Sequence, residues 1–316
     1  TGVAVSEIAR SGRILAQAGQ GRGPGGIESL ATAVESLTKT RLAATFGDVD
    51  ETTDGLIAIF GQFNKELEDT PRILDTVNQV AKDFAVESKD IFEAVKKGGA
   101  TFSALGGTFE EFTGLTALLR EETRETASSL GTFFKTGGIR LFAAKAEEAL
   151  KELDSSILAT NTLPARLNAL AIAFKNLEGT QKAAFSAQLV GVRQAARLIA
   201  VLDAINRNSD KLSSSLGKSF GSLDRDAGKR IDDLAVSFGK LRESINEAVK
   251  NFIDDDTIRT VLAGFTNLVG GITKIFSSLS GVLAPALGLG AVIGGIKLAG
   301  NVVRPSTRNI ELKNNS

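Results

Sequence analysis

The chain has 316 residues, of which 42% are apolar and 23% charged, and its 37 Lys and Arg balance its 37 Asp and Glu. This composition is typical of a folded protein with a sizeable core. The absence of Cys and His excludes disulfides, thiolate nucleophiles, histidine general bases and zinc sites with Cys or His ligands.

The pattern of the chain predicts an all-α fold built from long amphipathic helices and helical hairpins. Only five prolines occur, and stretches rich in Ala, Leu, Glu and Lys favour helix. No run of alternating β-branched residues predicts a sheet. The first helix is expected over about 3–18, and the Gly-rich run 19–26 separates it from the second.

Caps and glycines predict helix boundaries in the first half of the chain. Thr70-Pro71 supplies a side-chain oxygen for a helix cap and Pro for the first helical position. A short helix over about 88–97 is predicted to stop at Gly98-Gly99. Thr108 and Glu111 have the spacing of a capping box, so another helix is predicted to begin there.

Longer helices are predicted beyond this point. One runs from about 138 to 158, and two more cover 164–178 and 181–206, with Gly179 between them. The polar run 121–125 is predicted to lie on an exposed helix face.

Residues 227–253 carry the most regular spacing in the chain. Their apolar residues are separated by 3, 4, 3, 4, 3 and 4 positions, which is the seam of a coiled coil over about three heptads. Two interpretations are open, a seam that joins copies of the chain or an amphipathic helix packed within one copy. The seam residues are Ile231, Leu234, Phe238, Leu241, Ile245, Ala248 and Phe252.

Residues 259–303 are apolar without this spacing. The 22 residues between Lys274 and Lys297 carry no charge, and as a helix they span about 33 Å, enough for a bilayer core. The alternatives are a membrane-inserting segment and a Gly-rich helix packed in protein or against its own copies. The candidate membrane or helix-packing residues are Ile275, Gly290, Gly294 and Ile296.

No constellation of residues predicts catalysis. The acidic stretch 48–54 resembles a calcium loop, but Gly55 falls two positions late, so we predict that these residues cap a helix beginning near Thr53. The adjacent carboxylates Glu110-Glu111 and Glu121-Glu122 do not supply a pair that faces across a cleft. We therefore expect no catalytic residue, no metal site and no cofactor.

Charge is distributed unevenly along the chain. Residues 1–158 carry 17 basic and 24 acidic side chains, and residues 159–316 carry 20 basic and 13 acidic ones. The basic residues of the second half have acidic residues among them and no interleaved aromatic platform on which bases could stack. We expect no sequence-specific nucleic-acid partner.

Several segments, in their order along residues 4–158, resemble bacteriophage tail tape measure proteins. They predict an early helix, a helix–loop–helix, a Gly-Thr-Phe-Glu-Glu cap and a long helix, which is the order found in that family. The segments are Val5-Ser-Glu-Ile-Ala-Arg-Ser-Gly-Arg-Ile-Leu-Ala-Gln-Ala-Gly-Gln20, Ile73-Leu-Asp-Thr-Val-Asn-Gln-Val-Ala81, Phe84-Ala-Val-Glu-Ser-Lys-Asp-Ile-Phe-Glu-Ala-Val-Lys-Lys-Gly98, Leu105-Gly-Gly-Thr-Phe-Glu-Glu-Phe-Thr-Gly-Leu-Thr-Ala-Leu-Leu119 and Arg124-Glu-Thr-Ala-Ser-Ser-Leu-Gly-Thr-Phe-Phe-Lys135.

The resemblance implies a structural role in the virion. Such proteins line the lumen of the tail tube in a few copies, set its length during assembly in the host cytoplasm, and leave the tail before the DNA. Implied partners are further copies in a trimer, tail tube and baseplate or tail-tip proteins, tail assembly chaperones, and the host membrane, where apolar segments help form a channel. Family members are usually longer, so we expect this chain to be a fragment.

The sequence thus predicts five parts. They are a tape-measure-like domain over 1–158, a helical hairpin over 159–215, a coiled-coil-like helix over 216–258, the apolar segment 259–303 and a polar tail over 304–316. The leading hypothesis is a tail tape measure protein without enzymatic activity. The alternatives are a helical pore-forming protein unrelated to tails, a cytoplasmic coiled-coil scaffold and, as the weakest, an enzyme.

Overall fold

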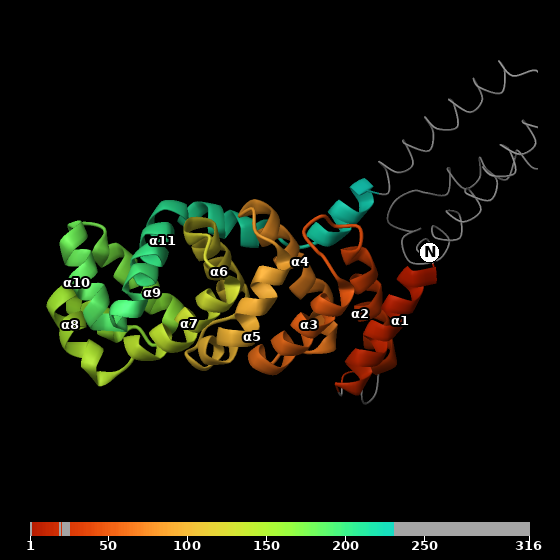
Figure 1. Cartoon of the computed structure of the whole chain (residues 1–316), viewed down its shortest axis with the longest axis horizontal. Helices are drawn as coiled ribbons and strands as arrows, with labels where there is room; N and C mark the ends of the chain where they lie inside the picture. The colour runs from red at the N-terminus through yellow and green to blue at the C-terminus, as the bar shows by residue number, and fades with distance from the viewer. Residues whose placement is uncertain (1, 19, 21–25, 231–316) are drawn as a thin grey trace, which may run out of the picture. The chain divides into compact units, whose positions relative to one another are not determined.

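The predicted all-α class is confirmed by a computed structural model, which describes residues 2–18, 20 and 26–230 (Figure 1). Within those residues the chain forms α-helices and short 3₁₀ helices, and no strand. A further helical stretch, from 222 to 230, follows the helices named in the next sentence. In chain order the helices are α1 (Gly2–Gln17), α2 (Gly26–Thr40), α3 (Val49–Phe63), η1 (Leu67–Asp69), α4 (Thr70–Asp83), α5 (Ser88–Ala104), α6 (Phe109–Thr123), α7 (Ala127–Leu141), α8 (Ala144–Asp154), η2 (Ser155–Ala159), α9 (Leu163–Phe174), α10 (Gly179–Val190) and α11 (Val192–Lys218).

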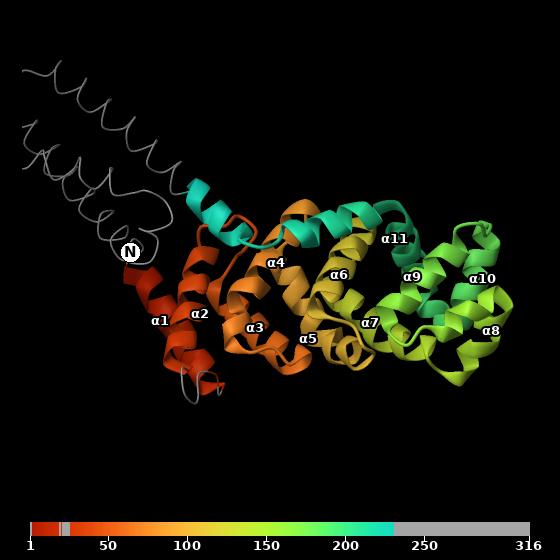
Figure 2. The same ribbon diagram turned by 180° about the vertical axis from the view of Figure 1, so that it is seen from behind.

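Most of the helices pack on near neighbours in the chain, whereas α11 packs both on its neighbours and on much earlier helices. α1 packs on α2, α3 on α5, and α5 on α7. α11 contacts α10 and α9 and then runs back across α6 to α4, so that it lies along the helices that precede it by a hundred residues (Figures 1 and 2). α11 therefore joins the later helices to the earlier ones.

Phenylalanine fills the centre of the core. The rings of Phe102, Phe112 and Phe134, from α5, α6 and α7, contact one another with centroids 5.1, 5.5 and 5.2 Å apart. All three side chains are fully buried. Such tilted and edge-on pairs add to the hydrophobic contribution of the buried area, and Phe brings no polar atom that needs a partner.

The capping box that begins α6 is confirmed. The hydroxyl of Thr108 accepts a hydrogen bond from the backbone N–H of Glu111 at 3.2 Å, and the Glu111 carboxylate accepts one from the N–H of Thr108 at 2.9 Å. Two N–H groups that the helix leaves free are satisfied in this way. The apolar stripe that follows the cap is buried, and its residues are Phe112, Leu115, Leu118 and Leu119.

Two other helix starts differ from the prediction in detail. Asp48 does cap α3, since its carboxylate accepts from the N–H of Asp50 at 2.6 Å, but the helix begins at Val49 rather than near Thr53. Thr70 does not cap α4, because its hydroxyl donates to the carbonyl of Leu67 in the preceding 3₁₀ helix. Short-range signals found these starts to within one helical turn.

The predicted helix end at Gly98-Gly99 is wrong. α5 continues to Ala104. Gly98 lies where it crosses α7, and Gly99 lies against Gln62 and Phe63 of α3. A Cβ on Gly98 would lie 2.3 Å from the carbonyl oxygen of Gly131, and one on Gly131 would lie 2.5 Å from that of Ala94. Glycine is used here for close backbone approach and not for helix termination.

The predicted helix over 138–158 is interrupted after Leu141, where α7 ends. The buried guanidinium of Arg166 donates to the carbonyl of Leu141 at 2.7 Å and lies over the ring of Phe142, 3.8 Å from its centroid. The Leu141 carbonyl has no partner within the helix because α7 ends there, and a side chain 25 residues later in the chain satisfies it. No signal within the helix itself predicts this partner.

The predicted helix over 181–206 is also divided, at Gly191. α10 ends at Val190, Gly191 has a φ of +82°, and α11 follows at once. Arg140 donates to the carbonyl of Val190 at 2.5 Å. Positive φ is readily adopted by Gly alone, so Gly191 ends one helix while Gly179, expected to separate two helices, begins α10.

Candidate functional site

The predicted oligomerisation and membrane residues lie outside the part of the chain that the structure describes. This applies to the whole seam and to the whole apolar segment, and both therefore stay predictions. Among the residues that are described, no helix has the length and apolar character needed to span a bilayer. The residues concerned are Ile231, Leu234, Phe238, Leu241, Ile245, Ala248, Phe252, Ile275, Gly290, Gly294 and Ile296.

The carboxylates weighed for chemistry in the first half have structural partners. Glu111 forms the capping box, and Glu110 lies 3.7 Å from the ammonium of Lys65. The stretch 48–54 supplies the cap of α3. Over 2–18 and 26–230, no group of three acidic side chains is placed to hold a metal ion.

The acidic run at the end of α6 faces α11, which corrects the prediction of a solvated face. Three of its carboxylates pair with basic side chains of α11, at exposures that leave each pair partly in water. Partly exposed pairs of this kind orient helices but contribute little free energy. The pairs are Glu121 with Lys211 at 2.8 Å, Glu122 with Arg207 at 2.7 Å and Glu125 with Arg197 at 2.6 Å.

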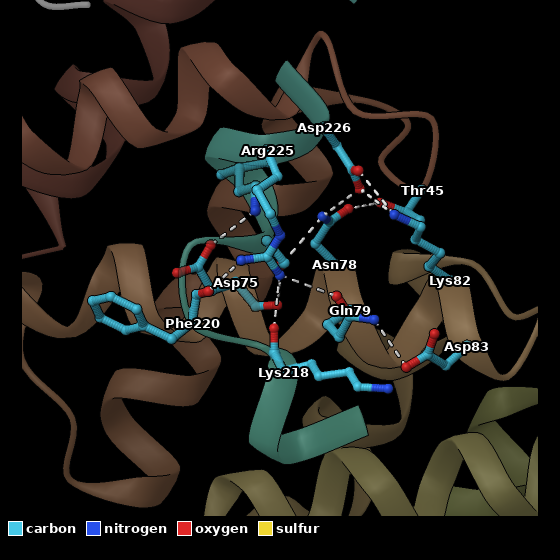
Figure 3. Close-up of polar contacts among 12 residues, drawn as sticks. Thr45, Asp75, Asn78, Gln79, Lys82, Asp83, Lys218, Phe220, Arg225 and Asp226 are labelled. Carbon is cyan, nitrogen blue, oxygen red and sulfur yellow. Dashed lines mark hydrogen bonds and ion pairs between the residues drawn. The ribbon is translucent and has the colours of Figure 1, made fainter. Parts of the chain in front are cut away.

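The densest polar cluster of the described residues joins α4 to the turn after α11 (Figure 3). The carboxylate of Asp75 accepts hydrogen bonds from the backbone N–H of Gly221 at 2.6 Å and of Leu223 at 2.9 Å. The hydroxyl of Ser222 donates to the backbone carbonyl of Asp75 at 2.7 Å. We call this cluster the α4 clamp; it consists of Asp75, Asn78 and Lys82 together with residues 221–226.

A second layer of the α4 clamp lies one turn along α4. The amide nitrogen of Asn78 donates to Asp226 at 2.9 Å and to the hydroxyl of Ser222 at 3.2 Å, and its oxygen accepts from the hydroxyl of Thr45. Lys82 forms an ion pair with Asp226 at 2.9 Å. Asn78 is fully buried and yet satisfied on both sides of its amide.

Two basic side chains complete the attachment of this turn. Arg225 donates to the backbone carbonyls of Lys218 and Phe220, each at 2.7 Å, and so satisfies carbonyls at the end of α11. Lys39 of α2 pairs with Asp224 at 2.7 Å. The ring of Phe220 points away from the cluster and is 78% exposed.

The two acids of the α4 clamp have opposite pKa shifts. Burial raises the pKa of Asp75, and the backbone N–H groups of Leu223 and Gly221 offset this only in part. Burial also raises the pKa of Asp226, but hydrogen bonds and charge from Lys82 and Asn78 outweigh it and hold that pKa below its ordinary value. The lowered pKa of Asp226 means that its ionised form stabilises the attachment.

The α4 clamp was not predicted from the sequence, because no motif singled out the polar residues of α4. Asp75, Asn78 and Lys82 have helical spacing of three and four, like the apolar stripe beside them. The one available signal was chemical, since Asp and Asn are poor residues for a helix interior. Here Asp75 binds the backbone of the turn after α11, and Asn78 binds the side chains of Asp226, Ser222 and Thr45. The chemistry of the cluster is attachment, since its donors and acceptors are used within the protein.

A protein-family model described as phage-related minor tail protein matches residues 1–191, more than half of the chain. The chain belongs to the phage-related minor tail protein family. Membership supports a structural role in a phage tail, association with the virion and contacts with other tail components. No solved structure matches the chain.

The family match ends at Gly191, the residue that separates α10 from α11. α11 and the turn that the α4 clamp holds therefore lie beyond the stretch of this minor tail protein that its family model covers. The structure attaches this later stretch to the matched one through α6 and α4.

Proposed function

We propose that this minor tail protein is a tape measure protein, which occupies the lumen of the tail tube, sets tail length during assembly and is released at infection. The observation that carries the proposal is the family match over residues 1–191. The ordered segments that resemble tape measure proteins, over residues 4–158, all lie within that match. The role is structural, without an enzymatic step.

The helical part that we describe is proposed to be a folded domain carried by the tape and not its length-setting stretch. Apart from α11, its α-helices have 11–17 residues and fold back on one another around a common core. A helix adds about 1.5 Å per residue to the length of the tape only where it runs along the tail axis and does not fold back. Residues 4–158, which resemble tape measure proteins, are therefore proposed not to measure length directly.

The later parts of the chain supply the remaining proposals, and these rest on sequence. The seam from Ile231 to Phe252 is proposed to join copies of the chain, as a trimer by resemblance to the family. The uncharged stretch from Ile275 to Ile296 is proposed to enter the host membrane at infection. Tail tube, baseplate or tail-tip proteins and assembly chaperones are the proposed partners in the virion and during its assembly.

An insertion experiment in the phage tests the length-setting role. One or two extra copies of residues 231–251, which are three heptads, are inserted after residue 251 so that the seam keeps its register. Each added copy lengthens an extended helix by about 30 Å. The matched control is a flexible 21-residue insertion after Asn176, in the exposed turn between α9 and α10.

Tail length is measured by electron microscopy. We expect tails to lengthen with each added copy and to keep their length in the control. Unchanged tails in both would overturn the tape measure proposal. Equal lengthening in both would retain it but contradict the proposal that the described part is a folded domain.

The location is tested by cryo-electron microscopy of intact tails. Helical density on the tube axis, in fewer copies than the surrounding ring, is the expected result. Labelled chain found only on the outside of the tube would contradict the lumenal location.

A further inference from the structure

We infer that residues 209–226, which we call the strap, detach as a unit from α4 and α6 by hinging at Asn208, while the first half of α11 stays docked. The inference concerns residues beyond the family match and does not depend on the tape measure role. Its consequence is a protein with two states, one in which residues 209–226 are held against α4 and α6 and one in which they are free.

The hinge is a break in the helical backbone of α11. Asn208 has φ −125° and ψ 18°, which is not helical, although the residues on both sides of it are. Asn often adopts such conformations because its side chain competes with the helix for backbone partners. A helix that is already broken at one residue needs little further change to turn there.

Burial changes abruptly at this hinge. Before it, Leu198, Val201 and Leu202 are fully buried against the core. Within the part of α11 after it, Ser215 is the one buried residue, and Leu212 and Leu216 are only partly covered. The apolar contacts that hold α11 in place therefore belong to its first half.

Apart from Leu223, which is buried in the core, the strap is held mainly by polar contacts. Lys211 pairs with Glu121 of α6 and lies 4.3 Å from the centroid of the Phe84 ring. The buried hydroxyl of Ser215 has no hydrogen-bond partner within the described residues. A surface with an unpaired buried hydroxyl and partly exposed ion pairs is poorly suited to permanent burial.

The α4 clamp closes the far end of the strap. The carboxylate of Asp75 accepts from two N–H groups of the turn, those of Gly221 and Leu223. Asp226 is bound by Asn78 and Lys82. The groups in these bonds are polar, so water takes the place of the lost partners when the strap opens. Exposing the apolar side chains of the first half of α11 brings no such compensation. The strap therefore opens before the first half of α11 does.

Hydrogen–deuterium exchange of the full chain, read by mass spectrometry on peptides, tests this order of opening. We expect amides of 209–218 and 222–226 to exchange together and faster than those of 195–207. Asp75→Asn places an amide N–H₂ against a backbone donor, and we expect it to speed exchange in the strap roughly tenfold. Exchange in 195–207 should stay unchanged.

Asp154→Asn is the matched control, because the Asp154 carboxylate likewise accepts from a backbone N–H, that of Ser156 at 2.8 Å, which lies outside the strap. It should leave the strap unaffected. Asp226→Asn tests the same clamp with a smaller change if Asp75→Asn fails to fold. Equal exchange rates on both sides of Asn208 in the unaltered chain, or a variant that accelerates both sides alike, would overturn the inference.

Discussion

Two helix contacts, that of α5 with α7 and that of α11 with α6, each contain a glycine. They differ in the atoms that the glycine faces. At the first, Gly98 faces the backbone of Gly131, with fully buried apolar side chains around it. At the second, Gly114 faces the flexible end of Leu212, with ion pairs beside it. Backbone against backbone leaves no room for adjustment, whereas a side chain is able to rotate away. The same residue type thus marks a rigid contact in one place and an adaptable one in the other.

The largest expected effect is on the contact between α5 and α7. Gly98→Ala should lower the free energy of unfolding by at least about 3 kcal/mol, since α5 and α7 must move apart to admit the methyl group. Urea unfolding followed by circular dichroism measures it. The control is Gly61→Ala on the exposed face of α3, where nothing lies within 4 Å, and which should stabilise the chain by about 0.5–1 kcal/mol. A Gly98→Ala chain within 1 kcal/mol of the parent would show that this crossing is adaptable after all.

The α4 clamp should show a dependence on pH through Asp226. Its pKa is held below the ordinary 3.8, so its ionised form stabilises the fold above that pH, and the contribution is lost as the pH falls through the lowered pKa. Asp226→Asn should cost about 1–2 kcal/mol at pH 7. The difference from the parent should shrink as unfolding is repeated at lower pH. The raised pKa of Asp75 acts in the opposite sense in both chains and cancels in the comparison. A difference that grows on acidification would contradict this assignment.

Gly114→Ala tests the contact between α6 and α11. The added methyl group meets only Leu212, and helix propensity favours Ala over Gly. We expect stability to stay within about 1 kcal/mol of the parent chain. Adding Leu212→Ala should remove the remaining clash and make the two changes non-additive. A cost as large as that of Gly98→Ala would mean that α11 is packed as tightly as α7.

The smallest expected effect concerns the hydroxyl of Ser215, on the buried face of α11. Ser215 is buried without a described partner, whereas the neighbouring Ser214 is exposed. Both changes to Ala improve helix propensity, but only Ser215→Ala removes an unsatisfied hydroxyl, so it should stabilise the chain by about 0.5–1 kcal/mol more. Unfolding of the two single variants gives the difference. Equal effects would indicate that a bound water satisfies Ser215.

Several signals that act within one helical turn were read correctly from the sequence, although Thr70 does not cap α4 and α3 begins at Val49 rather than near Thr53. The reciprocal bonds of Thr108 and Glu111, the cap at Asp48 and the buried stripe after Thr108 need only residues three or four positions apart. The resemblance of residues 4–158 to a phage tail family likewise depended on the order of such helices, and the family match over 1–191 confirms a phage tail protein. The seam and the apolar segment after residue 230 stay predictions.

What the sequence by itself determined was the all-α class, through helical spacing, helix-favouring composition and few prolines. Only the tertiary structure decided where several helices end and what the polar face of α4 binds. Gly98 lies at a helix crossing because Gly131 is opposite it, α7 ends where Arg166 satisfies its carbonyl, and the partners of Asp75 lie almost 150 residues later in the chain. A side chain's local preference is a property of its own stretch of chain, whereas the partner that satisfies a buried carboxylate or a free carbonyl is chosen by packing.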